Sequence, residues 1–398
     1  MERKPLQGIR VLEVAAYISG PYAGSLMTAL GAEVVKVEPA EGEAFRRGQG
    51  IEGAYFAQYN AGKKSVAVDL KSPEVIAMLK EMLPEFDVLI ENMRPGKLAQ
   101  LGLGEQVCRQ INPGLIYTSV SGFGSGGPMV DRPAYDTIGQ AFGGMQTVNN
   151  DAGKAALLGT CMADLITAIS TTIGIMGALI GRNRPGSDGR GYQIETSVLE
   201  AVSTINIDAI TQAFDENIEP VRNSRHPQAQ NFCLKTASGE FVALHLSSSQ
   251  KFWLKTLRSI GREELGEDPR FKTFHTRVEP ANYEIIKSIF EEEFVKRPLA
   301  EWEEILIRED VPHAHALTIH QLAEHPQTKW LDLIEYRPNG QAMVRPPWRF
   351  DGERPHRAQR APHVGEHTLE VFGKIRSPEQ LAALIAKKAI TVAKIPAE

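Results

Sequence analysis

One aspartate, Asp164, stands at the junction between a run of small residues and the most apolar stretch of the chain. The small residues are 158–163, and the apolar stretch runs from Leu165 to Ile180. Aspartate is a preferred helix N-cap, because its side chain accepts a hydrogen bond from an unpaired N–H of the first turn. A carboxylate can also act as a nucleophile toward an activated acyl group. Taken alone, this position favours the cap, and the rest of the chain must decide between the two interpretations.

Three other chemical signatures are weak or absent. Residues 122–127 satisfy Gly-x-Gly-x-x-Gly, but Pro128 follows where a dinucleotide site needs a helix N-terminus, so we interpret the segment as a loop. His313 and His315 lie two residues apart and have no carboxylate arranged as in a zinc helix, and we expect no metal. No serine has the Gly-x-Ser-x-Gly context of a hydrolase nucleophile.

Nine basic residues of the N-terminal half lie mostly in predicted loops where short apolar runs end. The whole chain has 44 basic and 49 acidic residues and a net charge of −5, which excludes a general attraction to nucleic acid or to an acidic membrane. A polyanionic ligand must therefore meet a local basic cluster, and a group of this kind at one rim is typical of a polyphosphate site. The nine are Lys36, Arg46, Arg47, Lys63, Lys64, Lys71, Arg94, Lys97 and Arg132.

The elements that must position these residues alternate between strands and helices. Helices are expected at Pro21–Leu30 and Pro73–Leu83, the second with Ser72 as its N-cap. Short strands rich in Val, Ile and Leu and separated by helices predict a parallel sheet covered on both faces. The ligand crevice of such a sheet lies beyond the carboxyl ends of its strands. The predicted strands are Val11–Ala16, Glu33–Val37, Ser65–Leu70, Asp87–Glu91 and Leu115–Val120.

Length and composition bound the remaining organisation. A chain of 398 residues suggests two domains. After Ile218 the sequence becomes richer in histidine, aromatic and charged residues. We therefore expect a smaller inserted domain there, with a hairpin turn at Ala237–Glu240. A final helix is expected from Pro378 to about Ala389. The three cysteines lack metal-ligand spacing and indicate reduced thiols in the cytoplasm. The apolar stretch is short for a membrane span, and no signal-peptide core is present at the start.

Many segments, in order along nearly the whole chain, resemble the class III coenzyme A-transferase family. This family also contains formyl-CoA transferase, carnitine CoA-transferase and α-methylacyl-CoA racemase. The matching segments are residues 5–13, 20–21, 30–39, 60–65, 69–71, 91–96, 135–136, 140–141, 189–191, 195–197 and 365–368.

The resemblance implies an α/β fold with a large Rossmann-like domain whose parallel sheet is built from both termini. A smaller α+β domain is inserted, and two chains form an intertwined homodimer. We expect the domains at residues 1–221, 222–326 and 327–398. The implied substrates are an acyl-CoA thioester and a small carboxylic acid, with no metal and no permanently bound cofactor. The implied coenzyme A contacts are Tyr17, Ile18, Lys71, Asn92, Met93, Arg94, Ala134, Tyr135 and Asp136.

Asp164 matches the catalytic aspartate of the family, so the resemblance reverses the choice between cap and nucleophile. A carboxylate can attack a thioester because coenzyme A leaves as a thiolate, which gives an aspartyl acyl anhydride. The thiolate then attacks the aspartyl carbonyl and releases the first acid. The acceptor acid repeats these steps in reverse. Backbone N–H groups near the helix start or in a small-domain loop are the candidates for stabilising each oxyanion, and the small domain is the expected cover.

Two alternatives stay open. Racemases of this fold carry histidine where this chain has Tyr135, and tyrosine is a poor general base at neutral pH, so transfer is favoured over racemisation or isomerisation of an acyl-CoA. A non-catalytic coenzyme A-binding protein, with Asp164 as a cap, is the other alternative. Oxalate and formate are not expected, because no glycine run occurs between Arg222 and Arg262. His226, Gln228 and Asn231 are candidates for binding the acid.

Overall fold

The computed structural model describes residues 4–46, 53–357 and 359–393, and its contacts divide the chain into two compact units. The first unit takes the described parts of residues 1–146, 157–207 and 327–398. The second takes residues 147–156 and 208–326, whereas the sequence places the start of the inserted part at residue 222. Each unit has its own buried core.

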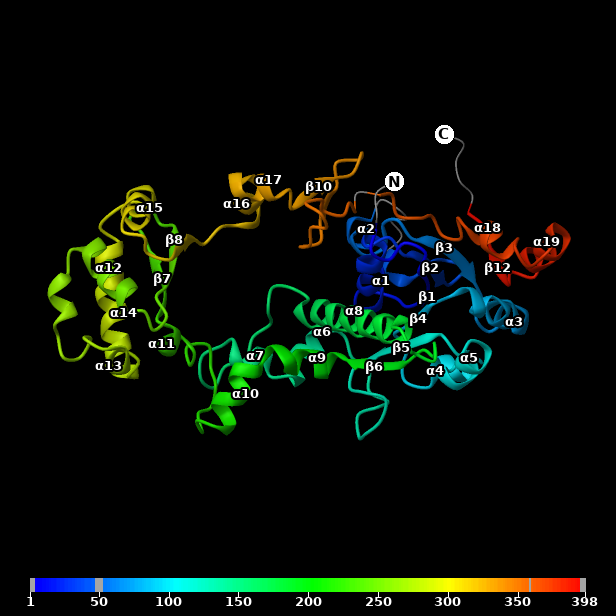
Figure 1. Cartoon of the computed structure of the whole chain (residues 1–398), viewed down its shortest axis with the longest axis horizontal. Helices are drawn as coiled ribbons and strands as arrows, with labels where there is room; N and C mark the ends of the chain where they lie inside the picture. The colour runs from blue at the N-terminus through cyan, green and yellow to red at the C-terminus, as the bar shows by residue number, and fades with distance from the viewer. Residues whose placement is uncertain (1–3, 47–52, 358, 394–398) are drawn as a thin grey trace. The chain divides into compact units, whose positions relative to one another are not determined.

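A seven-stranded sheet forms the centre of the first unit, in the order β12-β3-β2-β1-β4-β5-β6 (Figure 1). Neighbouring strands are parallel except β12, which runs antiparallel to β3. The strands are β1 (Arg10–Val14), β2 (Glu33–Glu38), β3 (Lys64–Val68), β4 (Val88–Glu91), β5 (Ile116–Ser121), β6 (Gln193–Ser197) and β12 (Ile390–Thr391).

Both faces of the sheet are buried over β1 to β4 and most of β5, which explains why these strands are rich in consecutive apolar residues. Successive residues of a strand point to opposite faces of the sheet and pack against different helices. Val11 packs with α1 (Ser19–Ala29) and α8 (Met162–Asn183), whereas Leu12 packs with α3 (Pro73–Met82) and α19 (Pro378–Ala386). The remaining helices of this unit include α2 (Ala54–Asn60), α4 (Lys97–Gln100), α5 (Glu105–Ile111), α6 (Asp136–Phe142), α9 (Val198–Ile205), α17 (Pro326–Leu331) and α18 (Thr368–Phe372), with η1 (Ala44–Arg46) and a β10–β11 hairpin (Ile334–Tyr336 and Ala342–Val344).

The strand predictions are confirmed, because all five strands end within two residues of their predicted bounds. Ser72 caps α3 as expected and accepts a hydrogen bond from the backbone N–H of Val75. The prediction for the final helix is wrong at its end. The helix stops at Ala386, Lys388 takes a left-handed conformation with φ of 58°, and β12 follows. A two-residue strand is too short to show a periodic pattern in the sequence.

The second unit packs α12 (Gln250–Ile260), α14 (Pro280–Phe294) and α15 (Leu299–Arg308) with a three-stranded antiparallel sheet. The expected hairpin is confirmed, because β7 (Asn231–Lys235) pairs with β8 (Phe241–His245) across the Ala237–Glu240 turn. Its other elements are α10 (Ile207–Phe214), α11 (His226–Ala229), η4 (Glu263–Gly266), α13 (Phe274–Arg277), β9 (His313–His315) and α16 (Ile319–Glu324).

One helix among the described residues, α8, is long and apolar enough to cross a membrane by length and composition. Half of its apolar window is buried inside the protein. Its buried face includes Ala168 and Ile175, which pack with residues of α1 and the sheet, so α8 is a core helix of the first unit.

Candidate active site

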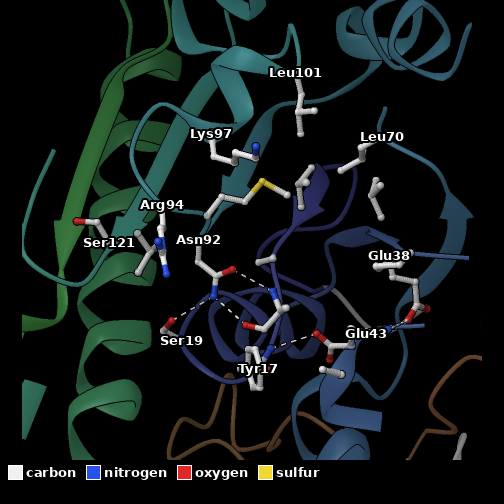
Figure 2. Close-up of a pocket in the computed structure, with 18 of the residues that line it drawn as sticks. Tyr17, Ser19, Glu38, Glu43, Leu70, Asn92, Arg94, Lys97, Leu101 and Ser121 are labelled. Atoms are coloured by element: carbon white, nitrogen blue, oxygen red, sulfur yellow. Dashed lines mark hydrogen bonds between the residues drawn. The ribbon is translucent and has the colours of Figure 1, made fainter. Parts of the chain in front are cut away.

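The carboxyl ends of strands β1 to β5 open into one cavity of about 790 Å³. Its lining includes the segments that follow these strands, as expected for a doubly covered parallel sheet (Figure 2). We call it the strand-end cavity. Of the side chains expected to contact coenzyme A, the lining includes Tyr17, Lys71, Asn92, Met93, Arg94, Ala134 and Tyr135, together with Asp164.

Ile18 and Asp136 are absent from that lining. Ile18 is the N-cap residue of α1, and its carbonyl oxygen accepts a hydrogen bond from the N–H of Tyr22 at 2.7 Å. Asp136 begins α6 and turns toward the start of α8. Their positions in the chain matched the family, but sequence position alone does not report the direction of a side chain.

Asp164 does not cap α8, so the cap interpretation is wrong. The helix begins at Met162 with Cys161 as its N-cap residue, which places Asp164 within the first turn. Its carboxylate is half-buried and faces the strand-end cavity. Burial, with a smaller contribution from the Asp136 carboxylate, raises the pKa of Asp164 to about 7, and no hydrogen bond from a described residue offsets this shift. Within the described parts of the chain the Asp164 carboxylate has no hydrogen-bond or ion-pair partner, so its oxygens are available for attack on an acyl group.

Asp136 is the residue that caps α8. Its Oδ1 accepts hydrogen bonds from the backbone N–H groups of Ala163 (2.9 Å) and Asp164 (3.2 Å). Its Oδ2 accepts a bond of 2.5 Å from the Gln140 amide, which also donates to the carbonyl oxygen of Thr160. The expectation that these first-turn N–H groups stabilise an oxyanion is therefore wrong, because Asp136 already occupies them. Burial raises the pKa of Asp136 itself.

The loop between β1 and α1 holds Tyr17 in a strained conformation. Tyr17 has φ of 65°, a left-handed value that is costly for a bulky side chain. Its N–H donates to Glu43 Oε2 at 3.1 Å, and the Asn92 amide both accepts from the Ala16 N–H (2.9 Å) and donates to the Ala16 carbonyl (2.8 Å) (Figure 2). Asn92 thus lines the cavity while its polar atoms fix this loop.

The prediction of a single basic cluster is wrong in part, because several of the nine residues are buried in ion pairs. Lys36 and Lys63 both bind Glu13, with Nζ–O distances of 3.1 and 2.6 Å. Arg46 binds Glu38 at 2.6 Å. Lys64 pairs at the surface with Glu33 and Glu370, at 2.6 and 2.8 Å. Arg47 lies outside the described residues.

The other four basic residues line the strand-end cavity, and Lys388 joins them. Among the described residues, none of these five cations forms an ion pair, so their charge is available to an anionic ligand. Lys388 was not predicted, because its position depends on the short terminal strand β12. The five, which we call the cavity cations, are Lys71, Arg94, Lys97, Arg132 and Lys388.

His226, Gln228 and Asn231 lie in the second unit, where α11 leads into β7. The His226 Nδ1 and Asn231 Oδ1 atoms are buried and have no hydrogen-bond partner within the described chain. Over those same residues, no three His, Cys, Asp or Glu side chains gather closely enough to hold a metal ion.

Comparison with known proteins agrees with this site. Residues 6–368 match the profile of CoA-transferase family III. Acetyl-CoA:oxalate CoA-transferase of Acetobacter aceti is 31% identical over 94% of this chain and 97% of that protein. Succinate–glutarate CoA-transferase of Agrobacterium fabrum is 28% identical over 96% of this chain and 98% of that protein.

A solved structure supports the same relationship. The crystal structure of a hypothetical protein from Mycobacterium tuberculosis superposes with a TM-score of 0.82 at 28% identity, covering 93% of this chain and 99% of that one. The sequence profile covers both units described above. The chain therefore belongs to CoA-transferase family III.

Proposed function

We propose that this protein moves coenzyme A between carboxylic acids, with Asp164 as the nucleophile. The observation that carries the proposal is the Asp164 carboxylate, which faces the strand-end cavity and has no hydrogen-bond partner among residues 4–46, 53–357 and 359–393. The cavity cations lie in the same cavity and provide the positive charge that a coenzyme A phosphate group needs. The relatives above act on different acids, so membership of the family leaves the acid undetermined.

The proposed reaction needs a carboxylate and a good leaving group. An Asp164 oxygen attacks the thioester carbonyl, the C–S bond breaks, and coenzyme A leaves as a thiolate, which gives a mixed anhydride. The thiolate attacks the aspartyl carbonyl and releases the first acid, leaving an aspartyl thioester. The acceptor carboxylate attacks the carbonyl of that thioester, the C–S bond breaks, and a second mixed anhydride forms. The released thiolate attacks the acceptor's acyl carbonyl in this anhydride, which gives the new acyl-CoA and regenerates the Asp164 carboxylate. No proton transfer is required in these steps.

The sheet order supports one direction for the bound coenzyme. Lys71 and Lys388 flank the β3 and β12 edge, whereas α8, which carries Asp164, packs on β5 and β6. Four strand spacings separate β3 from β5, about 19 Å. We infer that the phosphates lie toward Lys71 and Lys388 and that the thiol end extends to Asp164. Tyr17, Asn92, Met93, Ala134 and Tyr135 then flank the path between them. Ile18 and Asp136 act as positioning residues.

Removal of a cavity cation should weaken coenzyme A binding more than it slows the chemical step. We expect Arg94→Gln or Lys71→Gln to raise the Kd for coenzyme A about tenfold, because one charge-assisted contact to a phosphate is lost. The dependence of affinity on salt should become shallower. Calorimetric titration at two salt concentrations measures both effects. Lys329→Gln is a control outside the cavity lining, and an equal loss of affinity there would contradict the assignment.

Asp136 should control both the stability of α8 and the titration of Asp164. Asp136→Ala removes the acceptor for two helix N–H groups and should lower the free energy of unfolding by about 1–2 kcal/mol. Asp136→Asn keeps an acceptor oxygen but removes the charge, so the pKa of Asp164 should fall. The acid limb of the transfer rate should then move to lower pH. An unchanged limb in Asp136→Asn would show that the two carboxylates are not coupled.

We favour transfer over racemisation. Racemisation at the α-carbon needs a base on each face of the substrate, and no histidine lines the described part of the cavity. Tyr135 stands at the relevant position, with its ring edge-on to that of Tyr17 at 5.4 Å. Asp136, the other nearby carboxylate, is held by the start of α8 and does not line the cavity.

We propose a homodimer, supported by an exposed apolar stripe on α8. Ile169, Ile173 and Ile180 are 39%, 67% and 69% exposed, although α8 is otherwise a core helix. A second copy of this chain would remove these side chains from water. Sedimentation should give twice the chain mass of 43.8 kDa. Ile173→Glu should shift the protein toward the monomer, and a wild-type monomer would contradict the proposal.

We also place the protein in the cytoplasm. Its three cysteines, Cys108, Cys161 and Cys233, are unpaired, as expected for a reducing compartment.

Isotope exchange tests the proposed activity. Acyl-CoA is incubated with a labelled carboxylic acid, and the label should enter the thioester with wild-type protein but not with Asp164→Ala. Deuterium entering the α-carbon without label exchange would indicate a racemase. Coenzyme A binding with neither reaction, across a panel of acids, would indicate a binding protein.

A further inference from the structure

Six aromatic rings form a continuous cluster that reaches the strand-end cavity. The Tyr17 ring lies 5.4 Å from Tyr135 and 6.0 Å from Phe45, measured between centroids. Phe45 in turn lies 6.0 Å from Tyr59 and 6.4 Å from Tyr55. Tyr22 completes the group at 5.6 Å from Tyr59. We call these six residues the aromatic wall.

The aromatic wall extends from the cavity to the start of α8. Tyr17 and Tyr135 line the cavity together with Asp164. At the other end, the Tyr59 hydroxyl lies 3.9 Å from Cys161 Sγ, in the residue that precedes α8. Burial raises the pKa of Tyr59, and the nearby Asp164 carboxylate contributes to that shift. An acyl group attached to Asp164 is therefore formed beside aromatic rings.

A strained backbone conformation fixes the position of the Tyr17 ring. A left-handed tyrosine persists only where its surroundings hold it, and Glu43 and Asn92 hold the loop around Tyr17 from buried or half-buried positions. Glu43 Oε2 accepts from the Tyr17 N–H and lies 3.4 Å from Lys36 Nζ, while Glu43 Oε1 is buried without a hydrogen-bond partner among the described residues. Strain of this kind gathers at functional sites, and here its result is a ring presented to the cavity.

The charges near Asp164 disfavour a second carboxylate on the acid. Asp136, the acidic neighbour of Asp164, carries the same sign as such a group. Arg46 is committed to Glu38, and Lys63 to Glu13. Arg357 lies over the Tyr22 ring at 5.6 Å, but its guanidinium donates to the carbonyl oxygens of Val344 and Gln58 and to the Ser25 hydroxyl.

We propose that the acid handled by this enzyme is a monocarboxylic acid with an apolar or aromatic body, bound against the aromatic wall beside Asp164. This inference rests on the proposed transferase function and names its substrate class. An apolar or aromatic body gains from leaving water and from ring contacts. The distal carboxylate of a dicarboxylic acid held against the wall meets ring faces and the like charge of Asp136, because the unpaired cavity cations are assigned above to the coenzyme A phosphates.

Competition between acceptors tests the substrate class. With acetyl-CoA as donor, phenylacetate and 4-methylpentanoate should show kcat/KM at least about tenfold above succinate and glutarate. Equal or higher values for the dicarboxylic acids would overturn the inference while leaving the transferase function intact. Absence of transfer to every acid, with no acyl group on Asp164, would instead overturn the proposed function and the inference together.

A variant at Tyr17 tests the aromatic wall itself. Glycine adopts φ of 65° without strain, so Tyr17→Gly should fold while losing the ring. We expect the ratio of kcat/KM for phenylacetate to that for acetate to fall about tenfold. Tyr336→Ala removes a tyrosine that is 60% exposed and lies outside the aromatic wall, and it should leave the ratio unchanged. An unchanged ratio in Tyr17→Gly would show that the wall does not select the acid.

Discussion

Replacing Asp164 by asparagine or alanine is expected to reduce coenzyme A transfer at least about 1,000-fold, because the change removes the carboxylate that forms the proposed covalent intermediate. Coenzyme A binding should remain within about threefold of wild type, since the cavity cations are unchanged. Transfer by the wild type should fall as the pH drops through about 7, where Asp164 becomes protonated. Initial rates and coenzyme A affinities, measured from pH 5 to 9, give both quantities.

The change in the free energy of unfolding caused by Asp164→Asn has opposite signs for a nucleophile and for a structural cap. The pKa of Asp164 is raised from 3.8 to about 7 in the folded protein, so ionisation at neutral pH opposes folding. Asp164→Asn should therefore increase the free energy of unfolding by about 2 kcal/mol at pH 8, with the gain lost as the pH falls toward 4. A cap would show the opposite result, a loss of stability at pH 8.

The second large effect is expected at Glu13, which does not line the strand-end cavity. Glu13 is fully buried, and its two carboxylate oxygens bind Lys36 and Lys63, which are also buried. Burial already lowers the pKa of Lys63 to about 8. Glu13→Gln leaves two buried ammonium groups with less compensation and should lower the free energy of unfolding by about 3–5 kcal/mol. Denaturant unfolding at pH 7 measures this loss.

The ion pairs of Glu13 also connect to the loop that holds Tyr17 in the candidate active site. Lys36 donates to the carbonyl oxygen of Ala15 at 2.7 Å, directly before the loop that holds Tyr17. A surface pair is the matched control: Glu105→Gln breaks the i,i+4 contact with Arg109 and should cost less than about 0.5 kcal/mol. A loss for Glu13→Gln as small as for Glu105→Gln would contradict the role of the buried network.

The sequence predicted the sheet well, because buried parallel strands are short, apolar runs with clear boundaries. It also predicted the crevice at the strand ends and the position of Asp164 within it. It did not separate cations that face the cavity from those that neutralise buried glutamates. Lys36 and Lys71 illustrate the difference, because both lie on or after strands and only the first is paired with Glu13. Side-chain partners from distant segments decide that question, and no local pattern records them.

The start of α8 shows the same limit of prediction from local sequence patterns. The sequence offers Asp164 as the cap because it stands beside the apolar run, yet the capping carboxylate comes from Asp136, 28 residues earlier. A cap supplied from another helix depends on tertiary packing, so helix propensity cannot find it. The consequence is chemical, since the long-range cap leaves Asp164 free and occupies the N–H groups that were expected to bind an oxyanion.

Trapping the acylated enzyme tests the central claim most directly. The protein is mixed with acyl-CoA, treated with hydroxylamine and digested, and the peptides are mapped by mass. If Asp164 is the nucleophile, a hydroxamate should appear on the peptide that contains Asp164, with fragment ions assigning it to that residue. Transfer that proceeds while the Asp164 peptide stays unmodified, or a hydroxamate on another carboxylate, would contradict that claim.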